Sequence, residues 1–359
     1  MRLLALVTEA FGGSGGIARY NQDLMLALSN SARISEIVVL PRFAGPVSEE
    51  PAKVRQVAPS AGRVAWSARA LALVAQHHFD VIFCGHLYAV PVAAAIAGLR
   101  RIPLWAQVHG VDGWERRSAP YRRALQSAAL ITSVSRYTRA AFLSWAEVPP
   151  HRVRVLPNTV ATGYAARSRR DDLVARLGLV GRRVILTVGR VSALERYKGH
   201  DRIIAALPGI IAFVPDAAYL IVGSGDDRPR LQQLACEAGV GDRVVFAGHV
   251  PDPELPDHFA LAHVFAMPST GEGFGIVFIE AAASGLPVVG GNCDGSVDAL
   301  ADGRIGRLVD PHAPAEIEGA VIDALLGRHP VPADSEEVRR FAFARFAAHV
   351  DALVGALVP

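Results

Sequence analysis

Two glutamates, Glu272 and Glu280, stand eight positions apart around a glycine turn with the letters Gly-Phe-Gly. The apolar stretch 264–268 before this turn predicts a buried strand, and the stretch 276–284 after it predicts a helix. Such a turn points backbone N–H groups and the positive end of a helix dipole toward a ligand, which suits an anion. Carboxylates at the same place suit hydroxyl donors instead. We therefore expect a ligand that carries both phosphate and hydroxyl groups, a sugar nucleotide.

Two cations belong to the same half of the chain. Arg190 follows the predicted strand 184–188, and Lys198 precedes the predicted helix 202–207. Both would therefore lie at the same edge of the sheet, beyond the carboxyl ends of its strands. Arginine can hold phosphate oxygens through two hydrogen bonds, and lysine supplies a compact charge. Each charge-assisted contact is worth about 1.5–3 kcal/mol. The alternative is a pair of unrelated surface cations.

Glycine loops follow other predicted strands. Gly223-Ser-Gly225 follows the strand 218–222, and the run Gly12-Gly-Ser-Gly-Gly16 follows the strand 3–8. A loop of this kind can bring amides such as that of Gly16 against a diphosphate. A glycine cluster alone is a weak signal, so a tight turn that binds nothing is the alternative.

Two histidines lie just past predicted strands, His86 and His109. Ligands of open parallel sheets bind at the carboxyl ends of strands, which favours such positions. His109 is the stronger candidate, because Gly110 follows it and lets a ligand approach the backbone. The alternative for His109, and the preferred interpretation for His86, is a turn histidine whose hydrogen bonds are satisfied locally.

The chain has 359 residues, enough for two domains of ordinary size. Strands and helices alternate, which predicts an α/β fold with parallel sheets and right-handed crossovers. We expect a first domain over 1–163, a second over 164–335, and a last helix, about 336–359, that packs back on the first domain. The predicted strands are 3–8, 36–40, 81–84, 104–108, 130–134, 154–156, 184–188, 218–222, 244–246, 264–267, 287–289 and 306–309. The main predicted helices are 21–28, 64–76, 92–99, 121–128, 202–207, 276–284, 316–326 and 336–357.

The composition is that of a globular protein, with 51% hydrophobic and 20% charged residues. A net charge of +3 is too small to indicate binding of nucleic acid. The three cysteines show no metal-ligand spacing, and we expect them to be reduced and buried. The first residues predict a strand rather than a signal peptide, and no apolar stretch reaches the roughly 20 residues that span a bilayer. We therefore expect a cytoplasmic protein.

A basic stretch over 114–123 contains four arginines, Arg116, Arg117, Arg122 and Arg123. A run of charges is usually a solvated face. The alternative is contact with anionic lipid headgroups at the inner face of the cell membrane, where each cation adds about 1 kcal/mol.

With these residues assembled, the chain resembles the retaining glycosyltransferases of family four, which have the GT-B architecture. The similarity covers nearly the whole chain. The motifs that carry it are the glycine loop before Ile17, His109-Gly110, Pro157-Asn158, Gly189-Arg190, Lys198-Gly199, Gly223-Ser-Gly225, and Glu272-Gly-Phe-Gly with Glu280. The resemblance implies two facing Rossmann-like, doubly wound domains with a cleft between them, in which the first takes the acceptor and the second holds most of the donor.

The resemblance also implies roles for single residues. Arg190 and Lys198 would hold the diphosphate and offset the charge that builds on the leaving group. Glu280 would accept hydrogen bonds from ribose, and Glu272 would contact hydroxyls of the transferred sugar. His109 would lie near the sugar and the acceptor. The remaining donor-binding candidates are Gly16, Gly223, Gly225, Gly273, Phe274, Gly275 and Ile276.

Glycosyl transfer passes through an oxocarbenium-like state, so the site must stabilise a departing diphosphate. The chain lacks any Asp-x-Asp triplet, the device by which the other large glycosyltransferase architecture holds a metal. Arg190 and Lys198 would replace that metal, so we expect no metal ion and no cofactor besides the donor substrate. The loop 290–295 departs from the pattern of many relatives, and no role is predicted for Asp294.

The resulting hypothesis is a retaining hexosyltransferase of polysaccharide or glycolipid biosynthesis, acting on a glycan or lipid-linked acceptor. Mannose from GDP-mannose is preferred, because the stretch 195–201 resembles mannosyltransferases, and UDP-glucose or UDP-galactose is the alternative. A nicotinamide-dependent oxidoreductase would need an acidic residue about 20 positions past the glycine loop. Glu36 is near that place, but the glycine spacing does not fit. A sugar-nucleotide epimerase and a catalytically silent binding subunit are the remaining alternatives.

Overall fold

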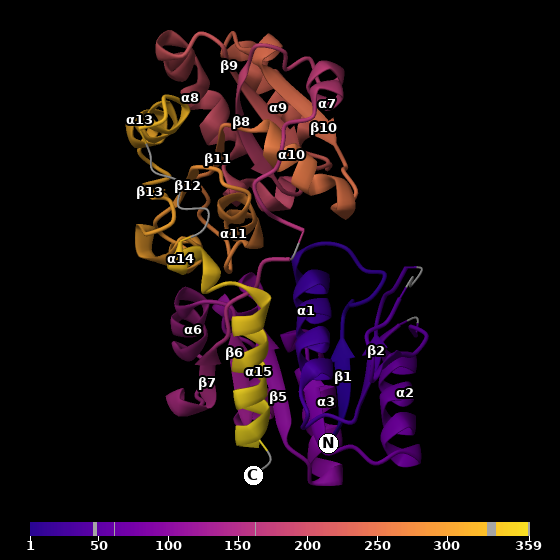
Figure 1. Ribbon diagram of the computed structural model, residues 1–359. Helices are drawn as coiled ribbons and strands as arrows, with labels where there is room; N and C mark the ends of the chain where they lie inside the picture. The colour runs from indigo at the N-terminus through magenta and orange to yellow at the C-terminus, as the bar shows by residue number, and fades with distance from the viewer. Residues whose placement is uncertain (46–48, 61, 162, 329–334, 358–359) are drawn as a thin grey trace. The chain divides into compact units, whose positions relative to one another are not determined.

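The protein is described by a computed structural model, which covers residues 1–45, 49–60, 62–161, 163–328 and 335–357 (Figure 1). The chain divides into two compact units. Unit 1 contains Met1–Thr159 and Phe343–Pro359, and unit 2 contains Val160–Ala342. The chain therefore leaves unit 1 once and returns to it near its end.

Unit 1 is built on a parallel seven-stranded sheet with the order β3-β2-β1-β4-β5-β6-β7. Its strands are β1 (Arg2–Val7), β2 (Glu36–Pro41), β3 (Val54–Gln56), β4 (Val81–Cys84), β5 (Leu104–Val108), β6 (Leu130–Ser133) and β7 (Val153–Val155). Residues of β1, β4 and β5 are almost entirely apolar and buried, which is typical of parallel strands covered on both faces.

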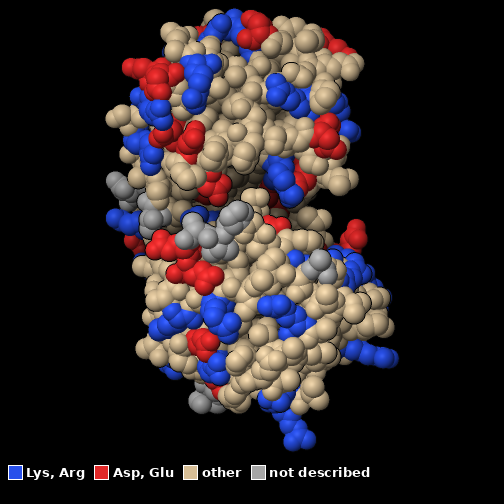
Figure 2. Space-filling model, turned by 90° about the vertical axis from the view of Figure 1, so that its right-hand side faces the viewer, with Lys and Arg blue, Asp and Glu red and all other residues tan. Residues whose placement is uncertain are grey.

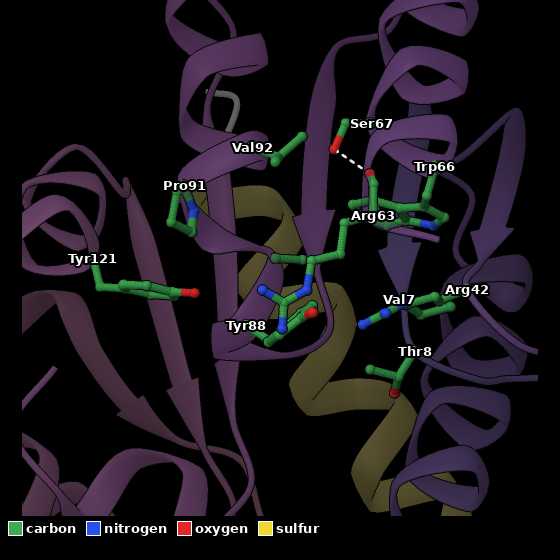
Figure 3. Close-up of a pocket in the computed structure, with 11 residues that line it drawn as sticks. Val7, Thr8, Arg42, Arg63, Trp66, Ser67, Tyr88, Pro91, Val92 and Tyr121 are labelled. Atoms are coloured by element: carbon green, nitrogen blue, oxygen red, sulfur yellow. Dashed lines mark hydrogen bonds between the residues drawn. The ribbon is translucent and has the colours of Figure 1, made fainter. Parts of the chain in front are cut away.

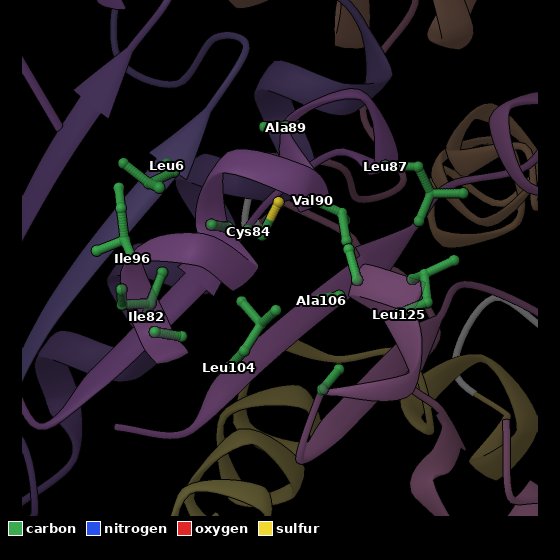
Figure 4. Close-up of a cluster of buried hydrophobic side chains, with 14 of the residues drawn as sticks. Leu6, Ile82, Cys84, Leu87, Ala89, Val90, Ile96, Leu104, Ala106 and Leu125 are labelled. Carbon is green, nitrogen blue, oxygen red and sulfur yellow. The ribbon is translucent and has the colours of Figure 1, made fainter. Parts of the chain in front are cut away.

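Helices cover both faces of this sheet. They are α1 (Gly16–Asn30), α2 (Arg63–Gln76), α3 (Val90–Arg100), α4 (Val111–Trp114), α5 (Ala119–Gln126), α6 (Arg136–Leu143) and α15 (Phe343–Leu357), with the short 3-10 turns η1 (Leu87–Ala89) and η2 (Pro150–Arg152). On one face, Ile82 and Leu104 of the sheet pack with Val90 and Ile96 of α3 (Figure 4). Each such buried aliphatic side chain stabilises the fold by about 1.5–3 kcal/mol. On the other face, α15 packs beside α1 (Figure 1).

Unit 2 repeats the plan with a parallel six-stranded sheet of order β10-β9-β8-β11-β12-β13. Its strands are β8 (Arg183–Val188), β9 (Ala217–Val222), β10 (Val244–Gly248), β11 (Val264–Met267), β12 (Val288–Gly291) and β13 (Arg307–Val309). Its helices are α7 (Asp171–Arg176), α8 (His200–Phe213), α9 (Arg228–Glu237), α10 (Leu255–Leu261), α11 (Ile276–Ala283), α12 (Ser296–Ala299), α13 (Pro314–Leu325) and α14 (Glu336–Arg339). The 3-10 turns are η3 (Ala193–Lys198), η4 (Gly241–Arg243), η5 (Asp252–Glu254) and η6 (Ala301–Gly303).

Both sheets have a switch point, where consecutive connections turn to opposite sides. In unit 1 it lies between β1 and β4, and in unit 2 between β8 and β11. Ligands of open parallel sheets bind outside the carboxyl ends of the strands at such a point. The loops that follow β1, β4, β8 and β11 are therefore the places where side chains can meet a ligand.

Two predictions about local structure are wrong. The helix predicted over 336–357 is two helices, α14 and α15, and residues 358–359 lie outside the described residues. The break occurs because the Val160 N–H donates to the Phe341 carbonyl at 3.0 Å, and Val160 forms an isolated bridge with Ala342. Of the cysteines, Cys84 is buried as expected, but Cys236 and Cys293 are exposed.

Candidate active site

The strand-end residues of unit 2 form a compact charged cluster. Lys198, at the end of η3, places its Nζ 2.5 Å from Oε1 of Glu272, which lies in the loop after β11. Both side chains are only 12% exposed. The two strands at the switch point thus bring together a cation predicted to hold phosphate and a carboxylate predicted to hold sugar hydroxyls.

Lys198 is charged throughout the physiological range. Burial on its own lowers the pKa of the ammonium, but the attraction of Glu272, together with Tyr197 and Glu195, outweighs burial and raises the pKa above its ordinary value. The ammonium also lies 5.3 Å from the centroid of the Tyr197 ring, which favours the charged form. Lys198 is therefore a fixed positive charge.

The second cation, Arg190, is arranged differently. Its side chain is 78% exposed and forms an ion pair with Glu195. Glu195 is 12% exposed, and its Oε2 lies 3.8 Å from Nζ of Lys198. One carboxylate therefore faces both cations, and an exposed arginine can exchange this partner for a phosphate at little cost in burial.

Gly223 and Gly225 allow two backbone segments to approach closely. A side-chain carbon at Gly223 would lie 1.9 Å from the carbonyl oxygen of Gly189, and one at Gly225 would lie 2.0 Å from that of Val191. The Val191 N–H donates to the Ser224 carbonyl at 3.0 Å across this contact. The two glycines thereby hold the segment that carries Arg190, whatever they also contribute to a ligand.

The loop that carries Glu272 is held by Asp294, which is 1% exposed. The Asp294 carboxylate accepts hydrogen bonds from the Glu272 N–H at 2.8 Å, from Ser269 Oγ at 2.8 Å and from the Ser296 N–H at 2.9 Å. The Gly295 N–H returns a bond to the Glu272 carbonyl at 2.9 Å. A buried carboxylate with several donors orients this loop strongly.

The other loop residues divide between backbone and packing roles. Gly275 has φ of 82°, a left-handed conformation that glycine adopts without strain, and it precedes Ile276, the first residue of α11. No side chain caps that helix start, so the first N–H groups of α11 are available to a ligand. Phe274 is 3% exposed and its ring lies 5.7 Å from that of Phe341, so this side chain anchors the loop. Glu280 lies within α11 and is 8% exposed.

In unit 1, His109 follows β5 and is half buried. Its Nε2 lies 2.8 Å from the Gly85 carbonyl oxygen, and its ring meets Tyr20 edge to face at 5.0 Å. Burial lowers the pKa of His109 to about 4, although Asp112 opposes that shift. The ring is therefore neutral at pH 7, and because Nε2 must donate to the carbonyl, Nδ1 is left as an acceptor.

Gly16 begins α1, directly after the loop that follows β1, and is exposed. The helix has no side-chain cap and no acidic residue in its first turn, so its N-terminal amides and dipole favour an anion. Asp112 caps the segment after β5, where it accepts from the N–H groups of His109 and Gly110 at 3.1 and 2.8 Å. The two unit 1 candidates thus follow β1 and β5.

The predicted lipid-contact arginines are mostly engaged within the chain. Arg116 and Arg122 lie 3.3 and 3.5 Å from Glu147, and Arg117 donates to the Asp112 carbonyl. Arg123, on α5, is exposed. On the face shown in Figure 2, acidic and basic side chains are interspersed. Among the described residues, no helix is long and apolar enough to cross a membrane.

No group of three or more His, Cys, Asp or Glu side chains within the described ranges is arranged to hold a metal ion. The site chemistry of unit 2 consists instead of two cations, their carboxylate partners and backbone amides. Sequence reasoning missed two members of this cluster, Glu195 and Asp294. Glu195 could have been found from its place three residues before Lys198. The sequence contains no signal for Asp294, because its partners in the Glu272 loop, Ser269 and Glu272, lie 25 and 22 positions away.

The family model for Glycosyltransferase Family 4 matches residues 14–164, and the model for Glycosyl transferases group 1 matches residues 170–341. A mannosyltransferase of Mycobacterium tuberculosis is 33% identical over 363 residues, covering 91% of this chain and 90% of the relative. The chain belongs to glycosyltransferase family 4. The predicted resemblance is confirmed.

Two relatives of this family 4 glycosyltransferase share one described activity. The M. tuberculosis protein is a GDP-mannose-dependent alpha-(1-6)-phosphatidylinositol monomannoside mannosyltransferase. A protein of the same description from Mycolicibacterium smegmatis is 39% identical over 272 residues, covering 70% of this chain and 69% of the relative. Among solved structures, Anabaena HepE in complex with UDP and glucose matches with a TM-score of 0.79 at 23% identity, covering 99% of this chain and 100% of HepE. The predicted GT-B fold is thereby confirmed.

Proposed function

We propose that this glycosyltransferase transfers mannose from GDP-mannose, with retention of anomeric configuration, to a hydroxyl of a glycan or lipid-linked acceptor. The observation that carries the proposal is the contact between Lys198 and Glu272 at the switch point of unit 2. It joins a phosphate-binding charge to a hydroxyl-binding carboxylate, which is the pair of functions that a sugar nucleotide requires.

Each residue then has a chemical task. Arg190 and Lys198 bind the diphosphate and stabilise the charge that develops as the sugar leaves. The amides of Gly273, Phe274, Gly275 and Ile276, with Glu272, bind the sugar, and Glu280 binds ribose. Gly223 and Gly225 border the diphosphate, and the Gly16 amide offers a further donor. Neutral His109 accepts a hydrogen bond from the sugar or the acceptor through Nδ1.

Retention follows from attack on the same face of the sugar as the departing diphosphate. In that mechanism a phosphate oxygen takes the proton of the acceptor hydroxyl, the C–O bond to phosphate breaks and the new glycosidic bond forms. No carboxylate nucleophile is then needed. Because the two cations balance the released charge, the reaction needs no metal ion and no cofactor.

Mannose on GDP is favoured because the two mycobacterial relatives are described as GDP-mannose-dependent mannosyltransferases. The same relatives favour an acceptor with a phosphatidylinositol core. UDP-glucose or UDP-galactose is the second candidate donor, since HepE was crystallised with UDP and glucose. Contact with a membrane surface through Arg123 and its neighbours would bring the enzyme to such an acceptor.

Thermal stabilisation by a panel of nucleotides tests the donor. GDP and GDP-mannose at a hundred times their Kd should each stabilise the folded protein by about 2.7 kcal/mol. Stabilisation by UDP and UDP-glucose alone would select the second donor. Stabilisation by NAD, or by no nucleoside diphosphate, would overturn the proposal. Proton NMR of the first product formed distinguishes retention from inversion.

A further inference from the structure

Unit 1 has a pocket of about 170 Å³ at the carboxyl edge of its sheet (Figure 3). One ordered water needs about 10–15 Å³, so the pocket can take a much larger group. Its wall combines residues after β1 and β2 with the first turns of α2 and α3 and with Tyr121 of α5. These elements end or begin at the edge where parallel sheets bind ligands.

Two arginines in this wall stack on one tyrosine. The guanidinium carbon of Arg42 lies 4.9 Å from the centroid of the Tyr88 ring, and that of Arg63 lies 4.5 Å from it. The two cations are therefore no more than about 10 Å apart, close to a Debye length in physiological salt. Like charges at this separation repel each other, and an anion between them would remove the repulsion.

Neither arginine has a carboxylate partner among the described residues. Elsewhere in the unit, Arg2 pairs with Glu36 at 2.7 Å and Arg19 with Asp23 at 3.3 Å. No Asp or Glu is among the described residues that line the pocket. The first turns of α2 and α3 also contain no acidic residue, so their dipoles add to the positive potential.

Three buried polar atoms at the pocket have no hydrogen-bond partner in the described part of the chain. They are Nε of Arg42, Nε1 of Trp66 and the hydroxyl oxygen of Tyr88. Trp66 is 5% exposed, so water does not readily replace the missing partner. Unpaired buried donors are costly to a fold, and their concentration at one pocket indicates a ligand that supplies acceptors.

We propose that this pocket binds the phosphate of a polyol-phosphate acceptor, with the guanidinium groups of Arg42 and Arg63 as its anion clamp. The inference rests on the proposed function, because it assigns the acceptor to that reaction. Guanidinium forks match phosphate oxygens and stay charged. Thr8, Tyr88 and Tyr121 line the same pocket, and their hydroxyl groups are suited to hydroxyls of the polyol ring.

Direct binding to the full chain tests the clamp without donor. The probes are myo-inositol 1-phosphate and myo-inositol, measured by calorimetry. Wild-type protein should bind the phosphorylated probe at least tenfold more tightly, and Arg42→Gln or Arg63→Gln should each remove most of that preference. Tyr88→Phe, which deletes only the unpaired hydroxyl, should weaken binding several-fold. Equal binding of the two probes by the wild type would overturn the proposal.

Arg69→Gln is the matched control, since Arg69 is an exposed arginine of the same helix that does not line the pocket. Its affinity for the phosphorylated probe should stay within twofold of wild type. An equal loss in Arg69→Gln and Arg63→Gln would indicate general surface charge and overturn the clamp. Thermal stabilisation by GDP should be unchanged in all variants. If the protein binds inositol phosphate but no nucleotide stabilises it, the result would support the anion clamp and refute the proposed function.

Vesicles distinguish a free phosphate from a lipid headgroup. Phosphatidylcholine vesicles containing phosphatidylinositol are compared with vesicles of equal charge containing phosphatidylserine. Arg42-dependent preference for phosphatidylinositol vesicles identifies a lipid phosphodiester, and binding of the soluble probe alone identifies a free phosphomonoester. Equal binding to both vesicles, reduced equally by Arg42→Gln and Arg69→Gln, would show nonspecific attraction to membranes and contradict the proposal.

Discussion

The ammonium of Lys198 lies 2.5 Å from the carboxylate of Glu272, and both side chains are largely buried. Removing one member of such a pair leaves the other charge without its partner in a poorly solvated place. The residue proposed to bind phosphate and the residue proposed to bind sugar therefore depend on each other. A substitution at either position is therefore expected to affect the binding role of the other residue as well.

Glu272→Gln keeps the shape of the side chain and an oxygen for Lys198, but removes the charge that is proposed to bind sugar hydroxyls. We expect kcat/KM for transfer to fall by at least about 100-fold, a loss of about 2.7 kcal/mol in transition-state stabilisation. Affinity for free GDP should stay within a few-fold of wild type. Steady-state kinetics and GDP titration check both results, and unchanged turnover would remove Glu272 from the site.

Arg190→Ala combined with Lys198→Ala should weaken binding of GDP far more than binding of GMP. If each cation forms the proposed charge-assisted bonds to the phosphates, it contributes about 1.5–3 kcal/mol, so the loss for GDP should be at least 100-fold. Arg176→Ala, at an exposed arginine of α7, serves as the control. Equal losses for the two nucleotides, measured by calorimetry, would count against a diphosphate clamp.

Asp294→Ala removes the acceptor of several buried hydrogen bonds at the Glu272 loop. We expect the free energy of unfolding of unit 2 to fall by about 2–4 kcal/mol and transfer activity to fall with it. Asp242→Ala should change stability by less than about 0.5 kcal/mol, because that side chain is 74% exposed. Urea denaturation followed by far-UV circular dichroism measures the free energy of unfolding of both variants. Equal values for Asp294→Ala and Asp242→Ala would contradict the proposal that Asp294 holds the Glu272 loop in place.

His109 should not change its charge between pH 8 and pH 5.5, because burial lowers its pKa to about 4. The unfolded chain binds this proton at about pH 6.5, so the contribution of neutral His109 to stability is complete above pH 6.5 and is lost as the pH falls toward 4. NMR titration of the imidazole resonances, assigned with His109→Gln, checks the pKa. A midpoint near 6.5 would show that the ring is solvated and able to act as a proton carrier.

Transfer activity should be unchanged after exhaustive treatment with EDTA, because two side-chain cations are proposed to balance the diphosphate charge. The measurement is the initial rate before and after dialysis against chelator, with added Mg²⁺ as the comparison. A strict requirement for Mg²⁺ would refute the metal-independent mechanism. It would leave the family membership intact.

Much of the fold could be predicted because long apolar strands and amphipathic helices carry their own periodicity. The strands before Arg190, Gly223 and Glu272 lie where the sequence indicated. β3 was missed, because its three residues, with a charged one in the middle, show no alternation. The break before α15 could not be predicted either, since it depends on a backbone bond between Val160 and Phe341, far apart in the chain.

Some residues of the candidate site could be predicted from the sequence, and others could not. Residues inside motifs, such as Lys198 and Glu272, were predicted as candidates from their neighbours in sequence. Asp294 was not, because its role exists only once β11 and β12 lie side by side and bring Ser269 and the Glu272 amide to it. The arginines of the unit 1 pocket lie 21 positions apart in the sequence, Arg42 in the loop after β2 and Arg63 at the start of α2, and their shared contact with Tyr88 arises only when the chain folds.

Unit 1 is assembled from two distant parts of the chain, and Ser31 Oγ donates to the Asp351 carboxylate across 320 positions of sequence. During synthesis from the N-terminus, α1 would be made long before α15 leaves the ribosome. The apolar face of α1 that contacts α15 therefore remains exposed to solvent while the whole of unit 2 is translated. Nascent protein truncated before residue 343 should be especially prone to capture by chaperones, whereas unit 2 can complete its own sheet earlier.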